Sequence, residues 1–101
     1  MSFVKIWVHA VWGTKHREPV LEKGIRIELF RHMKKNADEK GLRLNFINGI
    51  EDHVHALLQL TADLSIGKTM QLLKGEASFW ANQQHLLKNG NLAWADEYFA
   101  V

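Results

Sequence analysis

Two histidines in the middle of the chain have the spacing of a ligand pair. His53 and His55 stand two positions apart in an alternating segment, 51–60, which predicts a β-strand. Because side chains alternate along a strand, the two imidazoles share one face, while Val54 and the other apolar residues face the core. Side chains two positions apart are separated by about 6 to 7 Å, over which two imidazoles can bind one divalent ion. The pattern therefore predicts a metal site.

The alternative for this pair is two half-exposed polar side chains that bind nothing, since histidine is common both as a ligand and as an ordinary polar residue. If a metal binds, a third ligand could come from Glu51, which shares the histidine face, or from His9 in an earlier strand. Gln59 would lie about 13 Å from His55 along the strand and is a poorer choice.

Length and composition limit the class of protein. The chain has 101 residues, 47% of them hydrophobic, which predicts one domain over residues 1–101. The absence of cysteine excludes disulfides and thiolate metal sites. No apolar run approaches the roughly 18 residues of a membrane span, and no signal segment opens the chain, so we expect a soluble cytoplasmic protein. The net charge of +2 suits an anionic partner without requiring one.

The order of the expected elements indicates the fold class. They are a strand over 3–12, a helix over 20–40, strands over 43–50 and 51–60, a helix over 65–84 and a strand over 98–101. Pro19 and Ser65 mark the helix starts. This β-α-β-β-α-β order is that of the ferredoxin-like fold, an α+β domain whose two helices cover one face of an antiparallel sheet. Asn48-Gly49 has the sequence of a hairpin turn, although the alternation can also run through it.

The sheet face without helices needs an explanation, because its expected side chains would make a poor core. Alternation places basic, amide, aromatic and imidazole groups on it: Lys5, Trp7, His9, Arg43, Asn45, His53, His55 and Gln59. Phosphates bind Lys and Arg, and bases stack on aromatic planes, so this face is a candidate nucleic-acid surface. The alternatives are a solvated sheet face or a dimer interface.

Three segments carry a resemblance to a known family. They are Val8-His9-Ala10-Val11-Trp12-Gly13-Thr14-Lys15-His16-Arg17, Asp52-His53-Val54-His55-Ala56-Leu57-Leu58 and Met70-Gln71-Leu72-Leu73-Lys74-Gly75. In this order, over nearly the whole chain, they resemble the single-tyrosine transposases of small bacterial insertion sequences. These form the 200/605 group of the His-hydrophobic-His (HUH) endonucleases, to which the REP-associated tyrosine transposases are similar.

The resemblance implies a function. A protein of this kind is expected to bind single-stranded DNA with hairpins and to work as a homodimer. A tyrosine hydroxyl attacks a DNA phosphodiester and forms a 5′-phosphotyrosine link, so strands are cut and rejoined by transesterification. His53 and His55 are then implied as ligands of Mg²⁺ or Mn²⁺, which acts as a Lewis acid and template at the scissile phosphate. The expected DNA-binding residues are Lys5, Trp7, Arg43, Asn45 and Lys74.

The C-terminal segment departs from the family pattern. In the family the nucleophilic tyrosine lies on a further helix, after a segment that resembles residues 92–101. Tyr98 is the one tyrosine of the sequence, yet it matches an aromatic residue of the last strand and is expected to pack or hydrogen-bond there. On this comparison we expect the domain to be C-terminally short and to lack the nucleophile helix. A non-catalytic, single-stranded nucleic-acid-binding dimer is therefore the second hypothesis.

Overall fold

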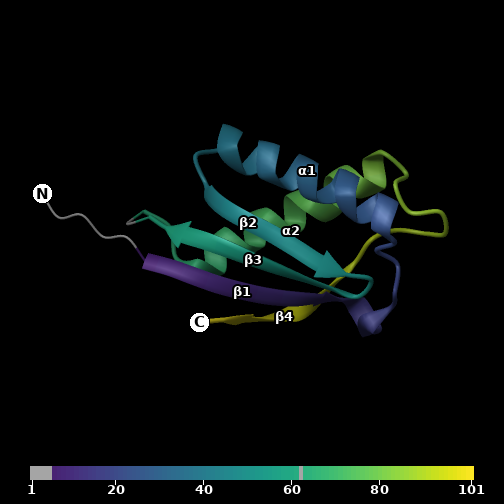
Figure 1. Cartoon of the computed structure of the whole chain (residues 1–101), viewed down its shortest axis with the longest axis horizontal. Coiled ribbons are helices and arrows are strands. Elements are labelled where there is room, and N and C mark those ends of the chain that lie inside the picture. The colour runs from purple at the N-terminus through teal and green to yellow at the C-terminus, as the bar shows by residue number, and fades with distance from the viewer. Residues whose placement is uncertain (1–5, 62) are drawn as a thin grey trace, which may run out of the picture.

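An antiparallel sheet and two helices make up the described part of the protein, as the sequence predicted. The computed structural model describes residues 6–61 and 63–101. In chain order the elements are β1 (Ile6–Thr14), the 3₁₀ turn η1 (Lys15–Arg17), α1 (Lys23–Glu39), β2 (Arg43–Ile50), β3 (His53–Leu60), α2 (Ile66–Gln83) and β4 (Trp94–Ala100). Both helices lie on the same side of the strands (Figure 1). No helix in these ranges is long and apolar enough to cross a membrane.

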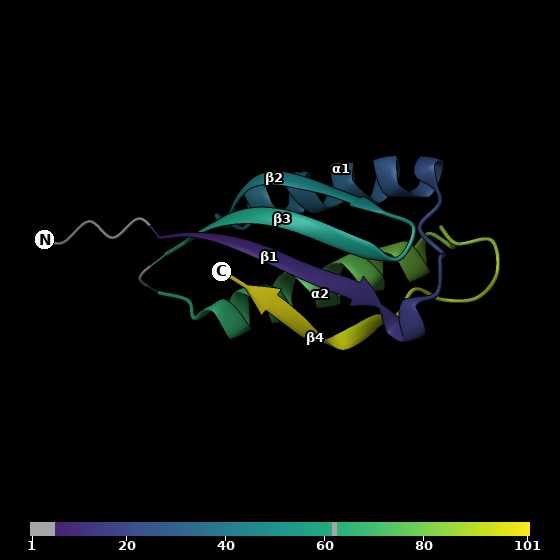
Figure 2. The same ribbon diagram turned by 60° about the horizontal axis from the view of Figure 1, so that its bottom comes forward.

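The strand order is β2-β3-β1-β4, and all three neighbouring pairs are antiparallel. β1 and β3 are therefore the central strands. Figure 2 shows the sheet in front of both helices, so that one sheet face is covered and the other is turned to the viewer. This is the ferredoxin-like arrangement expected from the order of elements.

The core lies between the sheet and the helices. Val8, Ala10 and Trp12 of β1 lie opposite Leu58, Ala56 and Val54 of β3, and all six are buried. The helices complete the core with their apolar stripes, which include the buried residues Leu29, Met33, Ala37, Met70, Leu73 and Ala77. Since every second residue of the central strands is committed to this core, the remaining residues face away from the helices.

A register shift in β2 changes which of its residues face the core. Leu44 pairs with Leu58, but Phe46 pairs with Leu57, so Asn45 is the extra residue of a bulge. Strict alternation would place Phe46 on the core side together with Leu44. The shift instead turns Phe46 and Asn48 away from the helices and packs Ile47 against the core.

The connection between β2 and β3 is the two-residue turn Glu51-Asp52, not Asn48-Gly49. Both Asn48 and Gly49 lie within β2 and pair with β3. β2 and β3 approach too closely at Gly49 for a side chain, because a Cβ atom on it would be 3.1 Å from Val54 Cα and would clash with the backbone carbonyl of His53. The hairpin-turn interpretation was therefore wrong, and the alternative that the strand runs through this position is confirmed.

α1 begins three residues later than the sequence indicated, at Lys23 rather than at residue 20. The preceding segment is held in a non-helical conformation by the turn before β3. Leu21 is fully buried, and its N–H donates to the carbonyl oxygen of Glu51 at 2.9 Å. Pro19 thus precedes the helix by four residues instead of starting it.

α2 begins where its cap predicted. The Ser65 side chain accepts a hydrogen bond from the Lys68 N–H at 3.1 Å, as an N-cap residue does. The loop from α2 to β4 is tied back to the helix by Asn82, whose amide donates to Leu92 O at 3.1 Å and accepts from Leu92 N at 2.6 Å. β4 then runs over Trp94–Ala100, longer than the expected 98–101, because β1 continues to Thr14 and pairs with it.

The two helices are joined by a polar contact beside the core. His32 of α1 places Nε2 2.7 Å from Glu76 Oε1 of α2. The His32 ring also stacks on Trp80 of α2, with centroids 4.0 Å apart and planes 6° from parallel. Both partners of His32 come from one face of α2, so a single side chain of α1 joins the two helices there.

Candidate metal centre

The uncovered sheet surface, which we call the open face, carries the histidine pair. Its central part consists of the outward side chains of β1 and β3: Trp7, His9, Val11, His53, His55, Leu57 and Gln59. His53 and His55 lie on this face as alternation predicted, half-buried, with ring centroids 5.0 Å apart and planes tilted by 57°. They come from a central strand whose other side is fixed in the core, so their backbone positions are rigidly held.

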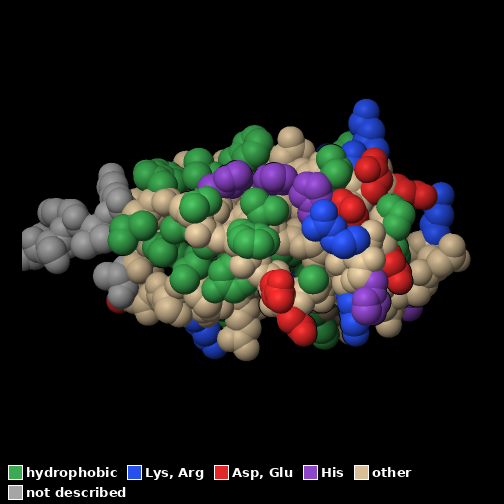
Figure 3. All heavy atoms as spheres, turned by 90° about the horizontal axis from the view of Figure 1, so that it is seen from below, with side chains coloured by type: hydrophobic (Ala, Val, Ile, Leu, Met, Phe, Trp, Pro, Cys, Tyr) green, Lys and Arg blue, Asp and Glu red, His purple; other side chains and the backbone are tan. Residues whose placement is uncertain are grey.

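His9 of β1 extends the pair into a row. Its ring stacks on that of His55, with centroids 5.5 Å apart. Histidine side chains accordingly form a line across the open face in Figure 3. Burial lowers the pKa of His55 below its ordinary 6.5, and the nearby charges of His53 and His9 lower it further. His55 is thereby favoured as a neutral imidazole, the form that binds metals.

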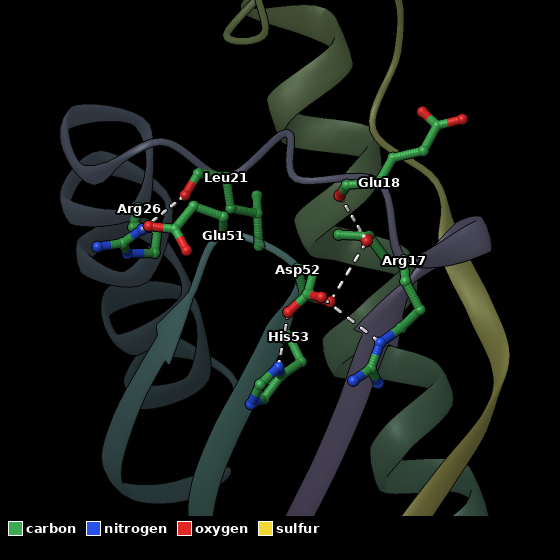
Figure 4. Close-up of polar contacts among 8 residues, drawn as sticks. Arg17, Glu18, Leu21, Arg26, Glu51, Asp52 and His53 are labelled. Carbon is green, nitrogen blue, oxygen red and sulfur yellow. Dashed lines mark hydrogen bonds and ion pairs between the residues drawn. The ribbon is translucent and has the colours of Figure 1, made fainter.

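Asp52 orients the first imidazole of the pair. His53 Nδ1 lies 2.8 Å from Asp52 Oδ1 (Figure 4). The hydrogen bond from His53 lowers the pKa of Asp52 most; the Arg17 charge lowers it further, against an opposing effect of burial. Since an ionised carboxylate only accepts hydrogen bonds, Nδ1 of His53 is the donor to Asp52, and Nε2 is the ring nitrogen left for a metal. A carboxylate behind a histidine is a common arrangement at metal sites.

The turn that carries Asp52 is anchored to the end of β1. Thr14 is buried, its N–H donates to the Asp52 carbonyl at 2.9 Å, and its hydroxyl donates to the Glu18 carbonyl at 2.8 Å. These bonds connect β1, the turn before β3 and the segment after η1. The position of Asp52 relative to His53 is therefore set by backbone contacts as well as by its own side chain.

Neither candidate for a third ligand completes a three-residue metal site with the pair. Glu51 Oε1 accepts from Arg26 Nη1 at 3.4 Å, and the same nitrogen donates to Leu21 O at 2.8 Å, which directs this carboxylate toward α1. His9 faces the same side as the pair but stacks on His55. Within residues 6–61 and 63–101, no three side chains of His, Asp or Glu are arranged to hold one metal ion.

Comparison with known proteins identifies the family to which this arrangement belongs. A family model described as IS200-like transposase matches residues 2–101. The chain belongs to the IS200-like transposase family. This confirms the resemblance seen in the sequence segments around His9, His53 and Lys74. A search of curated proteins found no match to the chain.

Two solved structures are similar to this IS200-like transposase. A candidate transposase from Deinococcus radiodurans R1 is 28% identical, and the match covers 99% of this chain and 80% of that one, with a TM-score of 0.84. A REP-associated tyrosine transposase, solved bound to a REP hairpin, is 15% identical and has a TM-score of 0.62. That match covers 100% of this chain but 59% of the other, and it shows the shared fold alone.

Of the residues expected to bind DNA in this IS200-like transposase, three lie toward one end of the sheet. Trp7 is 46% exposed and lies opposite Gln59, and Arg43 pairs with Gln59 from the other side. Asn45 is the exposed bulge residue of β2. Gln59 is six positions from His53 along β3, or roughly 20 Å. Lys5 lies outside the described residues.

An apolar hollow beside the histidines was missed by sequence reasoning. His9, His55, Phe46, Asn48, Gly49 and Ile50 line a shallow depression of about 250 Å³. Phe46 is 53% exposed, and Phe99 of β4, opposite Val11, is 75% exposed. Hydrophobic side chains lie along the histidine row in Figure 3. The bulge at Asn45 places Phe46 there, and bulges have no reliable signature in a single sequence.

Lys74 and Tyr98 of this IS200-like transposase lie on the covered side of the sheet. Tyr98 pairs with the core residue Trp12, and Lys74 Nζ donates to Ala95 O at 2.8 Å. Burial lowers the pKa of Lys74, with a smaller opposing effect of Asp96. Both residues line a groove of about 420 Å³ between α2 and β4. Neither is close to the histidine pair, because the sheet itself separates them.

Proposed function

We propose that this IS200-like transposase binds hairpin-bearing single-stranded DNA on its open face and cuts and rejoins it by metal-assisted transesterification at His53 and His55. The observation that carries the proposal is the oriented pair: one ring is hydrogen-bonded to Asp52, and burial lowers the pKa of the other. Family membership supports transposition as the process. The REP hairpin bound by the structural neighbour supports hairpin DNA as the substrate class.

The two rings fit a shared divalent ion. A metal–nitrogen bond is about 2.1 Å long, so imidazoles that share an ion have ring centroids within about 6 Å of each other. The centroids of His53 and His55 are 5.0 Å apart. Because both ligands are neutral, the charge of the ion is left to act on the substrate. When bound, Mg²⁺ or Mn²⁺ would polarise the scissile phosphate as a Lewis acid.

The remaining side chains of the open face have roles that follow from their chemistry. Trp7 offers an exposed aromatic plane on which a base can stack, and Arg43 offers a cation for a phosphate. In the reaction a hydroxyl oxygen bonds to phosphorus while the bond from phosphorus to the 3′ oxygen breaks. The reverse step restores the strand, and the number of phosphoester bonds stays the same.

A second candidate function is non-catalytic binding of single-stranded nucleic acid. The observation that favours it is the position of Tyr98, the one tyrosine in the sequence, on the helix-covered side of the sheet. Cleavage at the histidine pair requires a hydroxyl that is brought to the open face from elsewhere. Binding alone has no such requirement.

Calorimetric titration with Mn²⁺ tests the metal centre. We expect the unmodified protein to bind one ion and a His53→Ala, His55→Ala double variant to bind none. His85→Asn is the matched control, because His85 is exposed on the loop after α2 and asparagine tolerates its positive φ of 51°. Equal Mn²⁺ affinity in the double variant and the unmodified protein would refute the assignment of the pair as ligands.

Incubation with labelled hairpin-bearing single strands and Mn²⁺ separates the two functions. A covalent protein–DNA adduct on a denaturing gel supports strand cleavage, and binding without an adduct supports the second candidate. The Tyr98→Phe variant should behave like the unmodified protein, because its hydroxyl lies across the sheet from His53. If Tyr98→Phe forms no adduct while the unmodified protein does, the assignment of the reaction to the open face without Tyr98 is contradicted.

A homodimer is part of the proposal. It is supported by the exposed apolar side chains of Phe46 and Phe99, since large exposed apolar patches mark interaction sites. Light scattering at micromolar concentration should give twice the mass of the chain. A monomer that remains active on DNA would refute this part of the proposal.

A further inference from the structure

A basic side chain lies beside His53 on the open face. Gly13 of β1 is directly opposite His53 in the antiparallel pairing. A Cβ atom on Gly13 would lie 3.3 Å from Arg17 Cδ and 3.4 Å from Arg17 Nη1. The Arg17 side chain therefore folds back over the space that the glycine leaves empty. Basic side chains indeed follow the end of the histidine row in Figure 3.

The backbone that returns Arg17 to this position is strained. His16 and Arg17 have φ angles of 58° and 55°, in the left-handed region that residues with a Cβ seldom adopt. Two successive residues of this kind reverse the chain directly after β1. Such conformations persist only where the surroundings enforce them, and they cluster at sites that bind substrates. Here the hydrogen bonds of Thr14 to Glu18 and Asp52 hold both sides of the turn.

Asp52 links Arg17 to the candidate metal ligand. Its Oδ1 accepts from His53, and its Oδ2 lies 3.6 Å from Arg17 Nε (Figure 4). Among the described residues Asp52 is the one carboxylate paired with Arg17, whose side chain is 66% exposed. A guanidinium has five N–H donors in a planar fork, so the pairing at Nε leaves the terminal nitrogens for a ligand.

We infer that Arg17 is a substrate-contacting residue, whose terminal N–H groups bind non-bridging oxygens of the DNA phosphate held at His53 and His55. The inference rests on the proposed function and adds to it a residue that positions the phosphate. The planar fork of arginine can donate to the two non-bridging oxygens of a phosphodiester. Gly13 leaves room for this side chain, because a Cβ atom there would crowd Arg17 Cδ at 3.3 Å and force it to shift.

Fluorescence anisotropy with a labelled, hairpin-bearing single-stranded DNA tests the inference. Arg17→Gly removes the guanidinium and accepts the positive φ, so the turn is kept. We expect its DNA affinity in the presence of Mn²⁺ to fall about ten- to a hundredfold, the range for a lost charge-assisted hydrogen bond. The slope of log affinity against log salt should become shallower by about 0.7, the value for one phosphate contact on a single strand.

Three further variants make the test specific. His16→Gly is the matched control, because it relieves the same strain at the neighbouring residue and keeps the guanidinium; it should leave DNA affinity unchanged. Gly13→Val keeps Arg17 but crowds both its side chain and the Asp52 carbonyl oxygen, which would lie 3.4 Å from the added Cβ, and should also lower the affinity. Arg17→Lys keeps the charge without the fork and should restore only part of the affinity. Mn²⁺ affinity measured without DNA should stay within about twofold in Arg17→Lys, since Asp52 still orients His53.

The outcomes distinguish this inference from the proposed function. If the unmodified protein binds neither Mn²⁺ nor the DNA, the proposed function fails and the inference fails with it. If the unmodified protein binds both, and Arg17→Gly keeps its DNA affinity and salt slope, the inference alone is overturned. A triple variant that combines His53→Ala and His55→Ala with Arg17→Gly should lose less DNA affinity than the product of the fold-losses of the double variant and of Arg17→Gly, because all three residues act on one phosphate. Independent losses would place the contact of Arg17 on a different phosphate and overturn the inference.

Discussion

Replacement of Gly49 by alanine should destabilise the fold strongly and disturb the histidine pair at the same time. An added Cβ would clash with the carbonyl oxygen of His53 and would lie 3.1 Å from Val54 Cα and 3.2 Å from Phe30 Cζ. The phenyl ring can move, but the two β3 atoms belong to the backbone of a central strand. β2 and β3 must therefore separate locally at the point where His53 begins the strand.

The magnitude follows from this geometry. Gly49 is not among the residues with positive φ, so the cost is one of space and not of backbone conformation. Overpacking in a well-packed region costs about 1 to 3 kcal/mol, and a clash with backbone belongs at the upper end, about 3 kcal/mol. In a domain of this size 1 kcal/mol corresponds to a change in melting temperature of about 4 to 8 °C, so the melting temperature should fall by roughly 12 to 24 °C.

Thermal melting followed by circular dichroism measures the change in melting temperature. Gly75→Ala is a control that should change it in the opposite direction. Gly75 lies inside α2, and nothing is within 4 Å of where its Cβ would be. Alanine there should stabilise the protein by about 0.5 to 1 kcal/mol, because glycine is the poorer helix former. If Gly49→Ala melts at the temperature of the unmodified protein while Gly75→Ala melts higher, the close contact of Gly49 with His53 does not constrain the fold.

Further predictions concern the helix pair, the histidine row and the loop before β4. His32→Ala removes the ring stacked on Trp80 and should lower the free energy of unfolding in urea by about 1 to 2 kcal/mol; an unchanged midpoint would count against the contact. Burial lowers the pKa of His55 in the folded protein, so the unfolded chain takes up a proton first as the pH falls. The contribution of His55 to the free energy of unfolding is therefore fully present above pH 6.5 and is lost as the pH drops through the lower, folded-state pKa. Urea titrations across this pH window should show a smaller loss of unfolding free energy in His55→Gln than in the unmodified protein. An identical loss in both would refute the lowered pKa of His55. Asn82→Ala removes both hydrogen bonds to Leu92 and should cost about 2 kcal/mol, with faster amide exchange at Leu92; unaltered exchange would show that the loop holds without them.

The element order and the side of each central strand were readable from the sequence, because both depend on local periodicity. Val54, Ala56 and Leu58 recur every second residue, and such an apolar row has to be buried by helices. That requirement alone leaves His53 and His55 on the other face. The N-cap at Ser65 was equally local, since its side chain bonds to the backbone three residues later.

The features that the sequence did not predict depend on contacts between segments that are far apart in the chain. The bulge at Asn45 and the continuous strand through Gly49 depend on how β2 meets β3, and the same Asn-Gly pair is compatible with a turn when the neighbouring strand is ignored. The expected third ligand Glu51 is directed toward α1 by Arg26, a partner 25 residues away in the chain. Local spacing contains no information about such a competing cation.

The sequence by itself determined that two imidazoles would share one sheet face, since alternation in a half-buried strand is a local property of the backbone. Only the tertiary structure decided what surrounds them. Asp52 is next to His53 in the chain, but its second oxygen meets Arg17 because a strained turn folds that residue back over Gly13. Tyr98 was separated from the pair by the pairing of β4 with β1, which assigns it to the covered side. Each of these outcomes depends on strand register and chain reversal, which arise when segments far apart in sequence pack together.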